Sequence, residues 1–151
     1  MKRTASIAAL LLGLSFSAIA EPIPAPLARS IAAGGQVQAT MQNGVLRAVL
    51  ARPGVSFDAF ESFITGKVCA PYLLDARAGW GGARISRVEL RDESQVQGYA
   101  VQDPRQVCDA IGSIEGGAVN VKKYLAPIAW VCVAGNECRP RRQGERYSGD
   151  E

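Results

Sequence analysis

The cysteines are the residues whose type and spacing point most directly to chemistry. Cys69, Cys108, Cys132 and Cys138 fall 39, 24 and 6 positions apart. These intervals contain neither the C-x-x-C of thiol oxidoreductases nor the closely paired cysteines of structural zinc sites. An even number of cysteines in a small exported chain is typical of a disulfide framework, so we expect two disulfides and no metal site.

Three pairings of the four cysteines are open. We favour Cys132–Cys138, because Gly135 and Asn136 lie between them and favour a turn that brings the two ends together. That choice leaves Cys69–Cys108 to join distant segments. Closing so long a loop would restrict the unfolded chain by about 3–4 kcal/mol.

The chain contains no histidine. Catalysis by Ser-His-Asp or Cys-His groups is therefore excluded, and so is any zinc site or general base that needs histidine. A pair of carboxylates, as in glycosidases, remains an alternative. However, Asp58 and Glu61 also suit the first turn of a helix, and Asp92 and Glu93 suit a solvated turn. The sequence favours a protein that is not an enzyme and has no cofactor.

Two segments are candidates for binding a partner. The glycines around Trp80 could leave the indole exposed on a loop, where aromatic side chains anchor proteins or stack on sugars. The alternative is an indole folded back over the sheet, with the glycines permitting a tight turn. The second candidate is a basic patch that could dock on an acidic partner, or simply be solvated as charged tails often are. It consists of Arg139, Arg141, Arg142 and Arg146.

Residues 1–20 have the features of a cleavable signal peptide. Lys2 and Arg3 precede an apolar stretch, residues 7–14, and Ala18-Ile19-Ala20 is a small-x-small cleavage site. The apolar stretch is shorter than the roughly 20 residues that span a bilayer. We therefore expect cleavage after Ala20 and a periplasmic or secreted protein, with no transmembrane segment in the mature chain.

Cleavage would also change the charge of the protein. It would remove two basic residues, leaving 15 basic and 14 acidic side chains in place of 17 and 14. A net charge of +1 in place of +3 gives no general reason to expect nucleic acid or an anionic membrane as a partner.

The best-defined element of the mature chain is a hairpin at Asn43-Gly44, since both turn positions require positive φ. A two-residue turn places apolar residues opposite one another on one face, as a sheet with one buried side requires. These pairs are Met41 with Leu46, Ala39 with Ala48, and Val37 with Leu50.

Further elements follow from the apolar spacing. We expect a helix over residues 57–68, strands over 84–91 and 95–102, a helix over 103–112, and terminal strands near 119–124 and 128–133. A three-residue turn in the second hairpin would place Leu90 opposite Val96 and Ile85 opposite Val101.

The fold class is therefore α+β, an antiparallel sheet built from hairpins with two helices on one face. The order is strand-strand-helix, strand-strand-helix, and then the terminal strands. Residues 21–35 form a flexible lead-in, in which 27–33 could make a short helix. Residues 36–138 form one disulfide-bonded domain, and residues 139–151 form a polar tail.

These features suggest an exported bacterial protein that binds another protein of the cell envelope or another exported protein. An inhibitor, an immunity factor or an accessory component of an envelope or secretion assembly would fit. The alternative is a small carbohydrate- or cell-wall-binding protein, or a carboxylate-dependent hydrolase.

Overall fold

The computed structural model describes residues 20–33, 35, 37–75, 78–134 and 137–146. The predicted signal peptide, apart from Ala20, lies outside the described residues. So do Gly135 and Asn136 of the predicted turn and the chain beyond Arg146. Among the helices described, none is both long enough and apolar enough to cross a membrane.

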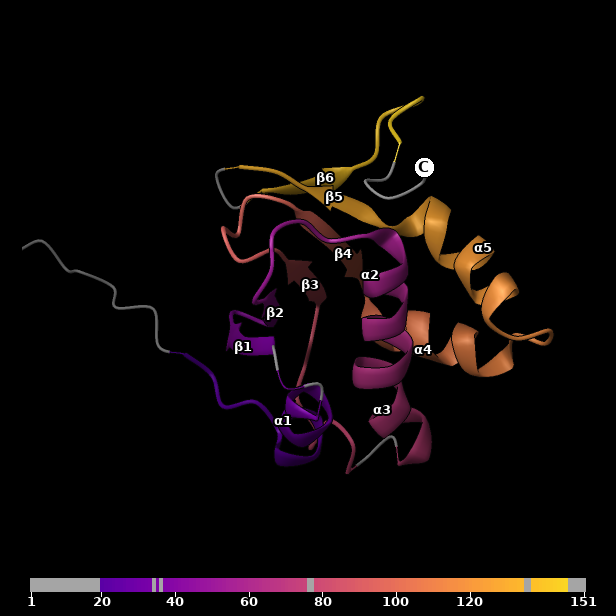
Figure 1. Ribbon diagram of the computed structural model, residues 1–151. Helices are drawn as coiled ribbons and strands as arrows, with labels where there is room; N and C mark the ends of the chain where they lie inside the picture. Colours follow the sequence, from indigo (N-terminus) through magenta and orange to yellow (C-terminus); the bar gives the residue numbers. More distant parts are fainter. Residues whose placement is uncertain (1–19, 34, 36, 76–77, 135–136, 147–151) are drawn as a thin grey trace, which may run out of the picture.

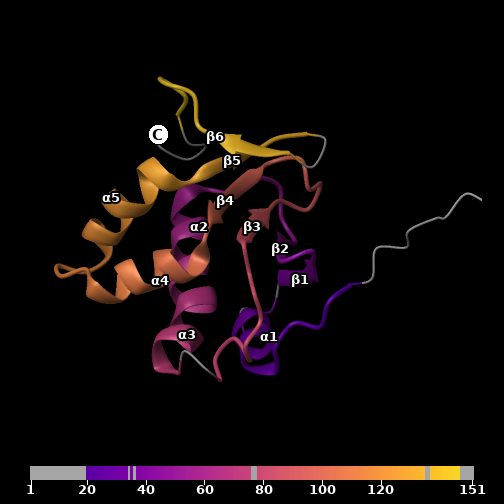
Figure 2. The ribbon, with the colours of Figure 1, turned by 180° about the vertical axis from the view of Figure 1, so that it is seen from behind.

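The described chain is a mixed α and β fold in which the helices pack on one face of a six-stranded sheet (Figures 1 and 2). The elements in order are α1 (Ala25–Ala32), β1 (Val37–Gln42), β2 (Val45–Leu50), α2 (Phe57–Phe63), the π-helix η1 (Ile64–Cys69), α3 (Ala70–Leu74), β3 (Arg87–Arg91), β4 (Gly98–Gln102), α4 (Pro104–Ser113), α5 (Ala118–Ile128), β5 (Trp130–Cys132) and β6 (Cys138–Pro140). Since α2, η1 and α3 run on without a break, the described chain has four separate helices. The sequence predicted two of them and allowed a short third helix at 27–33.

The strands lie side by side in the order of the sequence, from β1 to β6. Every neighbouring pair is antiparallel except β2 and β3, which are parallel. The expectation of a wholly antiparallel sheet is therefore wrong at this position. Between β2 and β3 the chain forms the long helical segment α2–η1–α3, and a crossover of this length returns it in the same direction.

The first hairpin is confirmed. Met41 pairs with Leu46, Ala39 with Ala48, and Val37 with Leu50. At the turn, Asn43 and Gly44 both have positive φ, at 51° and 74°. Local turn chemistry and the apolar pattern were sufficient to set this register.

The register predicted for the second hairpin is wrong. Leu90 pairs with Tyr99, while Val96 is exposed in the connecting loop. The connection spans residues 92–97, and the Asp92 carboxylate organises it by accepting hydrogen bonds from the backbone N–H groups of Val96 and Gln97. An acceptor side chain at the end of β3 stabilises this wider turn in place of a three-residue one.

The terminal strand predicted near residues 119–124 is also wrong, because this segment belongs to α5. Val121 and Leu125 are buried one helical turn apart, whereas Val119 is exposed. Burial therefore follows a helical period, and α5 packs beside α2. The last predicted strand shortens to β5, Trp130–Cys132.

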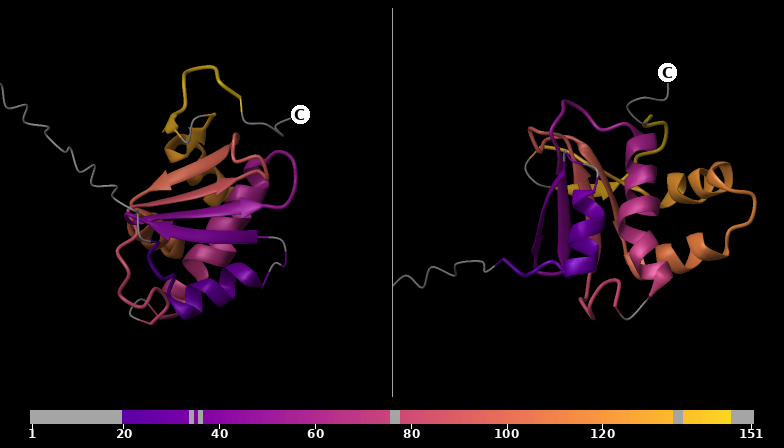
Figure 3. Two further views of the ribbon diagram at one scale, coloured as in Figure 1. Left: turned by 90° about the vertical axis from the view of Figure 1, so that its left-hand side faces the viewer. Right: turned by 60° about the horizontal axis from the view of Figure 1, so that its bottom comes forward.

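The core lies between the helices and one face of the sheet. The right-hand view of Figure 3 shows the sheet nearly edge-on, with the helices on one side of it. Leu27 and Ile31 of α1 are buried in it, so part of the predicted flexible lead-in is a packed helix. The two disulfides join Cys69 to Cys108 and Cys132 to Cys138, as predicted. The first ties η1 to α4 in the core, and the second links the paired strands β5 and β6.

Candidate functional site

Trp80, the first predicted binding residue, is 0% exposed. Its indole N–H donates a hydrogen bond of 3.0 Å to the carbonyl oxygen of Val68 in η1, and its ring packs on Tyr72. A π-helix shifts the hydrogen-bond pattern of the helix that contains it, and Trp80 provides a donor at that point. The exposed anchor expected at Trp80 is not seen. The indole is folded back, as in the alternative interpretation, although its contacts are with the helical segment.

The glycines beside Trp80 serve this burial. A Cβ added at Gly79 would overlap the carbonyl oxygen of Pro71, so the loop approaches α3 this closely because residue 79 has no side chain. Gly81 and Gly82 have positive φ of 54° and 76°, which completes the turn. The glycine-rich segment therefore allows the indole to pack against the helical segment.

The predicted basic tail begins as an ordered loop. Arg139 forms a bidentate ion pair with Glu145, with N–O distances of 2.9 and 2.8 Å. Glu145 also accepts the backbone N–H of Arg142 at 2.8 Å. The Arg139 guanidinium and this N–H group together hold the pKa of the Glu145 carboxyl at about 2. Residues 139–146 therefore form a closed loop, anchored to the sheet through β6.

This loop borders an open hollow of about 1030 Å³, which we call the basic hollow. One wall comes from the end of α5 and the start of β5, residues 127–130, and the other from residues 140–146. Figure 1 shows this loop, in yellow, beside the end of α5. Three of the four predicted arginines line the hollow, namely Arg141, Arg142 and Arg146. The fourth, Arg139, supports the loop through Glu145.

Electrostatics make the basic hollow attractive to anions. Among the described residues that line it, Glu145 is the one acidic residue, and its charge is already matched by Arg139. Three arginines and one carboxylate are found in this described lining, so positively charged side chains outnumber negatively charged ones there. Trp130, half-buried at the start of β5, adds an aromatic surface that the sequence analysis did not identify. The sequence around Trp130 showed only the apolar pattern that is typical of a buried strand.

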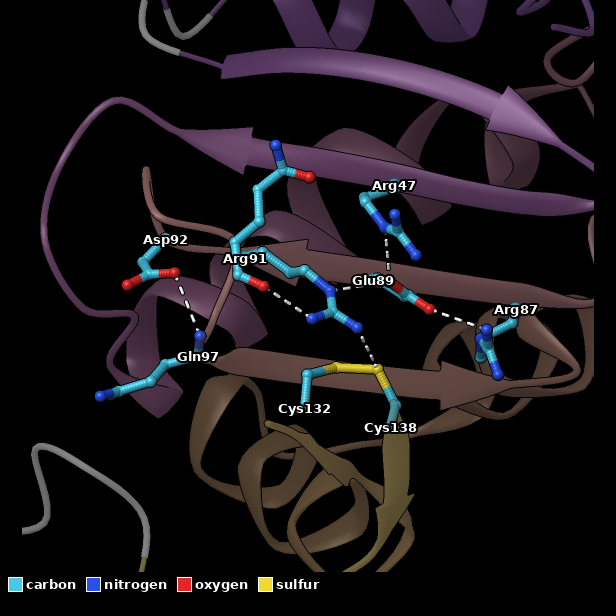
Figure 4. Close-up of a disulfide and its surroundings, with 9 residues drawn as sticks. Arg47, Arg87, Glu89, Arg91, Asp92, Gln97, Cys132 and Cys138 are labelled. Carbon is cyan, nitrogen blue, oxygen red and sulfur yellow. Dashed lines mark hydrogen bonds and ion pairs between the residues drawn. A yellow bond between two sulfur atoms is a disulfide. The ribbon is translucent and has the colours of Figure 1, made fainter. Parts of the chain in front are cut away.

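A second cluster lies on the face of the sheet opposite the helices. Glu89 of β3 is 0% exposed, and its carboxylate contacts the guanidinium groups of Arg47, Arg87 and Arg91 at 2.8, 2.9 and 2.9 Å (Figure 4). The register explains the contacts, because Arg47 of β2 is the cross-strand partner of Glu89. Arg87 and Arg91 flank it two residues away on the same strand face.

Glu89 remains ionised in this cluster. Burial alone would raise the pKa of its carboxyl, but hydrogen bonds and charge from Arg47 and Arg91 outweigh burial and hold the pKa below its ordinary value. The cluster of one carboxylate and three guanidinium groups has a net positive charge. It cannot provide the protonated acid that a glycosidase needs.

The Cys132–Cys138 disulfide lies against this cluster. Nη2 of Arg91 is 3.2 Å from Sγ of Cys138. The carboxylate of Glu89 and the sulfur atoms of Cys132 and Cys138 lie within 4.8 Å of one another, a grouping that could hold a metal ion if the thiols were free. Here both sulfurs are in a disulfide and Glu89 is surrounded by guanidinium groups, which disfavours a cation at this place.

The four acidic residues considered for hydrolysis do not line the basic hollow, namely Asp58, Glu61, Asp92 and Glu93. Asp58 of α2 pairs with Lys122 at 2.7 Å on the surface. The pKa of the nearby Glu61 is raised by partial burial and by the charge of Asp58. Neither residue lines the basic hollow, and Asp92 organises a turn.

In comparisons with known proteins, no family model, curated protein or solved structure matches this chain. A function for this chain must therefore be inferred from its own geometry.

Proposed function

We propose that this chain is an exported binding protein that holds an acidic segment of another protein in the basic hollow. The observation that carries the proposal is the charge balance of the hollow. Among the described residues, three arginines line it, and the one lining carboxylate, Glu145, is paired with Arg139. Arginine forms bidentate hydrogen bonds with carboxylates, so an acidic peptide has the complementary chemistry.

The size and lining of the hollow agree with a peptide ligand. Its volume of about 1030 Å³ accommodates several side chains. Trp130 and Ile128 supply apolar contact surface beside the arginines, a combination typical of protein-binding sites. The ordered Arg139–Glu145 pair holds one wall in place before the ligand arrives, which lowers the entropy cost of binding.

Export is supported by the sequence and is compatible with the disulfides. Residues 1–20 carry the signal-peptide pattern, and disulfides persist in oxidising compartments. The partner would therefore be a protein of the cell envelope or another exported protein.

The proposal can be tested by calorimetry with residues 21–151 and short peptides. A glutamate-rich peptide should bind, and the same peptide with glutamine in place of glutamate should bind at least about tenfold more weakly. The triple variant Arg141→Gln, Arg142→Gln, Arg146→Gln should lose a similar factor. A matched triple variant at exposed arginines elsewhere is Arg29→Gln, Arg52→Gln, Arg84→Gln.

The matched variant has the same net charge but an intact hollow, so its affinity should stay within about twofold of the unmodified chain. Equal losses in the two triple variants would mean that binding follows net charge, and the proposed site would be wrong. Binding of a neutral cell-wall oligosaccharide that is insensitive to the hollow arginines would favour the carbohydrate-binding alternative instead.

A further inference from the structure

The Cys132–Cys138 disulfide lies beside a fixed positive charge. Arg91 is 0% exposed, and its three nitrogen atoms are all engaged: Nε on Glu89, Nη1 on the backbone oxygen of Gln95, and Nη2 on Sγ of Cys138 at 3.2 Å (Figure 4). Two of these contacts orient the guanidinium group, and the third directs it at the sulfur.

The sheet register explains how Arg91 reaches the disulfide. Arg91 pairs with Gly98, Gly98 pairs with Cys132, and Cys132 pairs with Cys138, so all four lie in one row across strands β3 to β6. Residue 98 is a glycine, so no side chain stands between Arg91 and the sulfur atoms. The long side chain of Arg91 extends over this gap.

A guanidinium group at this position stabilises the reduced state more than the oxidised state. A disulfide sulfur is neutral and a weak hydrogen-bond acceptor, whereas a thiolate carries a full charge and accepts a strong, charge-assisted hydrogen bond. The charges around Cys138 are Arg91, Glu89 with its further partners Arg47 and Arg87, and the neighbours Glu137 and Arg139 along the strand. Because Glu89 is outweighed by its three arginines, the cluster favours an anion at the sulfur.

The two disulfides differ in access. Cys138 is half-buried, whereas Cys69 and Cys108 are both 0% exposed in the core. Reduction of Cys132–Cys138 would release a three-residue edge strand, β6, and would leave the core disulfide in place. Although Cys132 is 4% exposed and Cys138 is only half-buried, we therefore expect the fold to depend less on this bridge than on the core bridge.

We propose that Cys132–Cys138 is a thiol–disulfide exchange site that accepts two electrons from a dithiol, such as a pair of cysteines on another exported protein. A thiolate of the dithiol attacks Sγ of Cys138, the bond between Cys138 and Cys132 breaks, and Cys132 leaves and takes up a proton. The second thiol of the dithiol then attacks its partner's sulfur in the mixed disulfide. Cys138 leaves as a thiolate paired with Arg91, the dithiol becomes a disulfide, and its second proton passes to solvent.

This inference goes beyond the binding role and does not depend on it. Residues 21–151 are equilibrated with mixtures of reduced and oxidised dithiothreitol, and free thiols are alkylated and located by peptide mass. Cys132 and Cys138 should become alkylated in mixtures that leave Cys69–Cys108 intact, while the circular dichroism signal of the helices is retained. In the reduced protein, alkylation of Cys138 should remain fast well below about pH 8.5, where an ordinary cysteine is protonated.

The role of Arg91 is tested with Arg91→Met, which should make the bridge at least about tenfold harder to reduce because the thiolate loses its charged partner. The comparison variant is Arg87→Met, which also removes a guanidinium group from Glu89 but on the side away from the disulfide (Figure 4). Its effect on reduction should be much smaller. If Arg91→Met does not fold, the pH dependence of alkylation in the unmodified chain decides alone.

Two results would overturn the inference. One is that both disulfides reduce together, or that Cys132–Cys138 reduces only when the fold is lost. The other is that Cys138 in the reduced chain is alkylated with the pH dependence of an ordinary thiol. Either result leaves peptide binding to the basic hollow untouched, so the two proposals fail separately.

Discussion

Glu89 is a carboxylate without exposed surface on the face of the sheet that the helices leave uncovered. The alternation of charged and apolar residues in Arg87–Arg91 predicts correctly which residues point away from the core. It does not predict that Glu89 is buried there, because this burial comes from Arg47 on β2 and from Arg87 and Arg91 on its own strand. Side chains that bury one another across strands leave no periodic signal in the sequence.

The substitution Glu89→Gln should destabilise the fold. The substitution leaves the buried Arg91 without its counter-charge, and removing one partner of a buried pair costs about 3 kcal/mol or more. The free energy of unfolding, measured by urea denaturation at pH 7, should fall by that amount. The exposed pair provides the control, since Asp58→Asn should change it by less than about 1 kcal/mol.

The stabilising effect of Glu89 should also depend on pH. Because the pKa of Glu89 in the fold lies below its ordinary value of 4.5, its contribution to stability is fully present above about pH 4.5 and is lost as the pH falls through the folded-state pKa. The difference in unfolding free energy between the unmodified chain and Glu89→Gln should therefore shrink as the pH is lowered from 5 towards 3. A difference that stayed constant over this range would contradict the ionised state of Glu89.

The glycines beside Trp80 are compatible with an exposed indole and with a buried one, so they could not predict which of the two forms. The deciding contact is the carbonyl oxygen of Val68 in a π-helical turn, which the sequence pattern does not reveal. Trp80→Phe keeps an aromatic ring but removes the N–H donor to this buried oxygen. The free energy of unfolding should fall by about 1–3 kcal/mol. Trp130→Phe, at a half-buried position in the basic hollow, should cost less, and equal losses would argue against a special role of the Val68 bond.

At the scale of elements, local signals predicted structure well where the chain pairs with itself nearby. Asn43-Gly44 fixed both the turn and the register of the first hairpin. The apolar spacing predicted a helix over residues 57–68, and Ser56 caps the start of α2 by accepting a hydrogen bond from the N–H of Ala59. These elements depend on interactions between residues a few positions apart.

The sequence did not correctly predict the elements whose structure depends on contacts with residues far away in the chain. Residues 118–128 contain β-branched and aromatic residues, and their helical form is fixed by the burial of Val121 and Leu125 beside α2. The parallel pairing of β2 with β3 likewise depends on where the long helical crossover returns the chain. The basic hollow combines α5, β5 and the loop after β6, so its arginines were predicted but Trp130 was not.

The two disulfides should differ in their contribution to stability, because they close loops of very different length. They bridge sequence separations of 39 and 6 residues. Restriction of the unfolded chain predicts a loss of about 4 kcal/mol for Cys69→Ala with Cys108→Ala, and of about 2 kcal/mol for Cys132→Ala with Cys138→Ala. Urea unfolding under non-oxidising conditions measures both. A larger loss from the short bridge would indicate that β6 supports the fold more than its length suggests.

At the scale of the whole molecule, the proposed binding and exchange sites lie at the same edge of the sheet. The hollow and the disulfide share β6, since Pro140 lines the hollow and Cys138 belongs to the disulfide. The helices cover the face of the sheet opposite the Glu89 cluster and pack against the core (Figure 3). Separating a packed face from a charged face is what allows one small domain to hold buried charges without interrupting its core.

The first described residues allow a prediction about export. The backbone N–H of Glu21 donates a hydrogen bond of 2.8 Å to the carbonyl oxygen of Met41, at the edge of β1. If cleavage follows Ala20, the new ammonium group of Glu21 can make the same bond, so processing leaves the sheet edge intact. The chain expressed from residue 1 in a bacterium should be recovered from the periplasm or medium with Glu21 as its first residue, as mass spectrometry would show.

The small residues at positions 18 and 20 are what the peptidase recognises, whereas position 19 between them is tolerant. Ala18→Leu should therefore leave an unprocessed, cell-associated chain that is heavier by residues 1–20, and Ile19→Leu should be processed normally. Recovery of the unmodified chain in the cytoplasm with residues 1–20 attached would contradict export. It would also remove the oxidising setting on which both the disulfides and the proposed exchange with exported dithiols depend, because a reducing compartment would keep Cys132 and Cys138 as thiols.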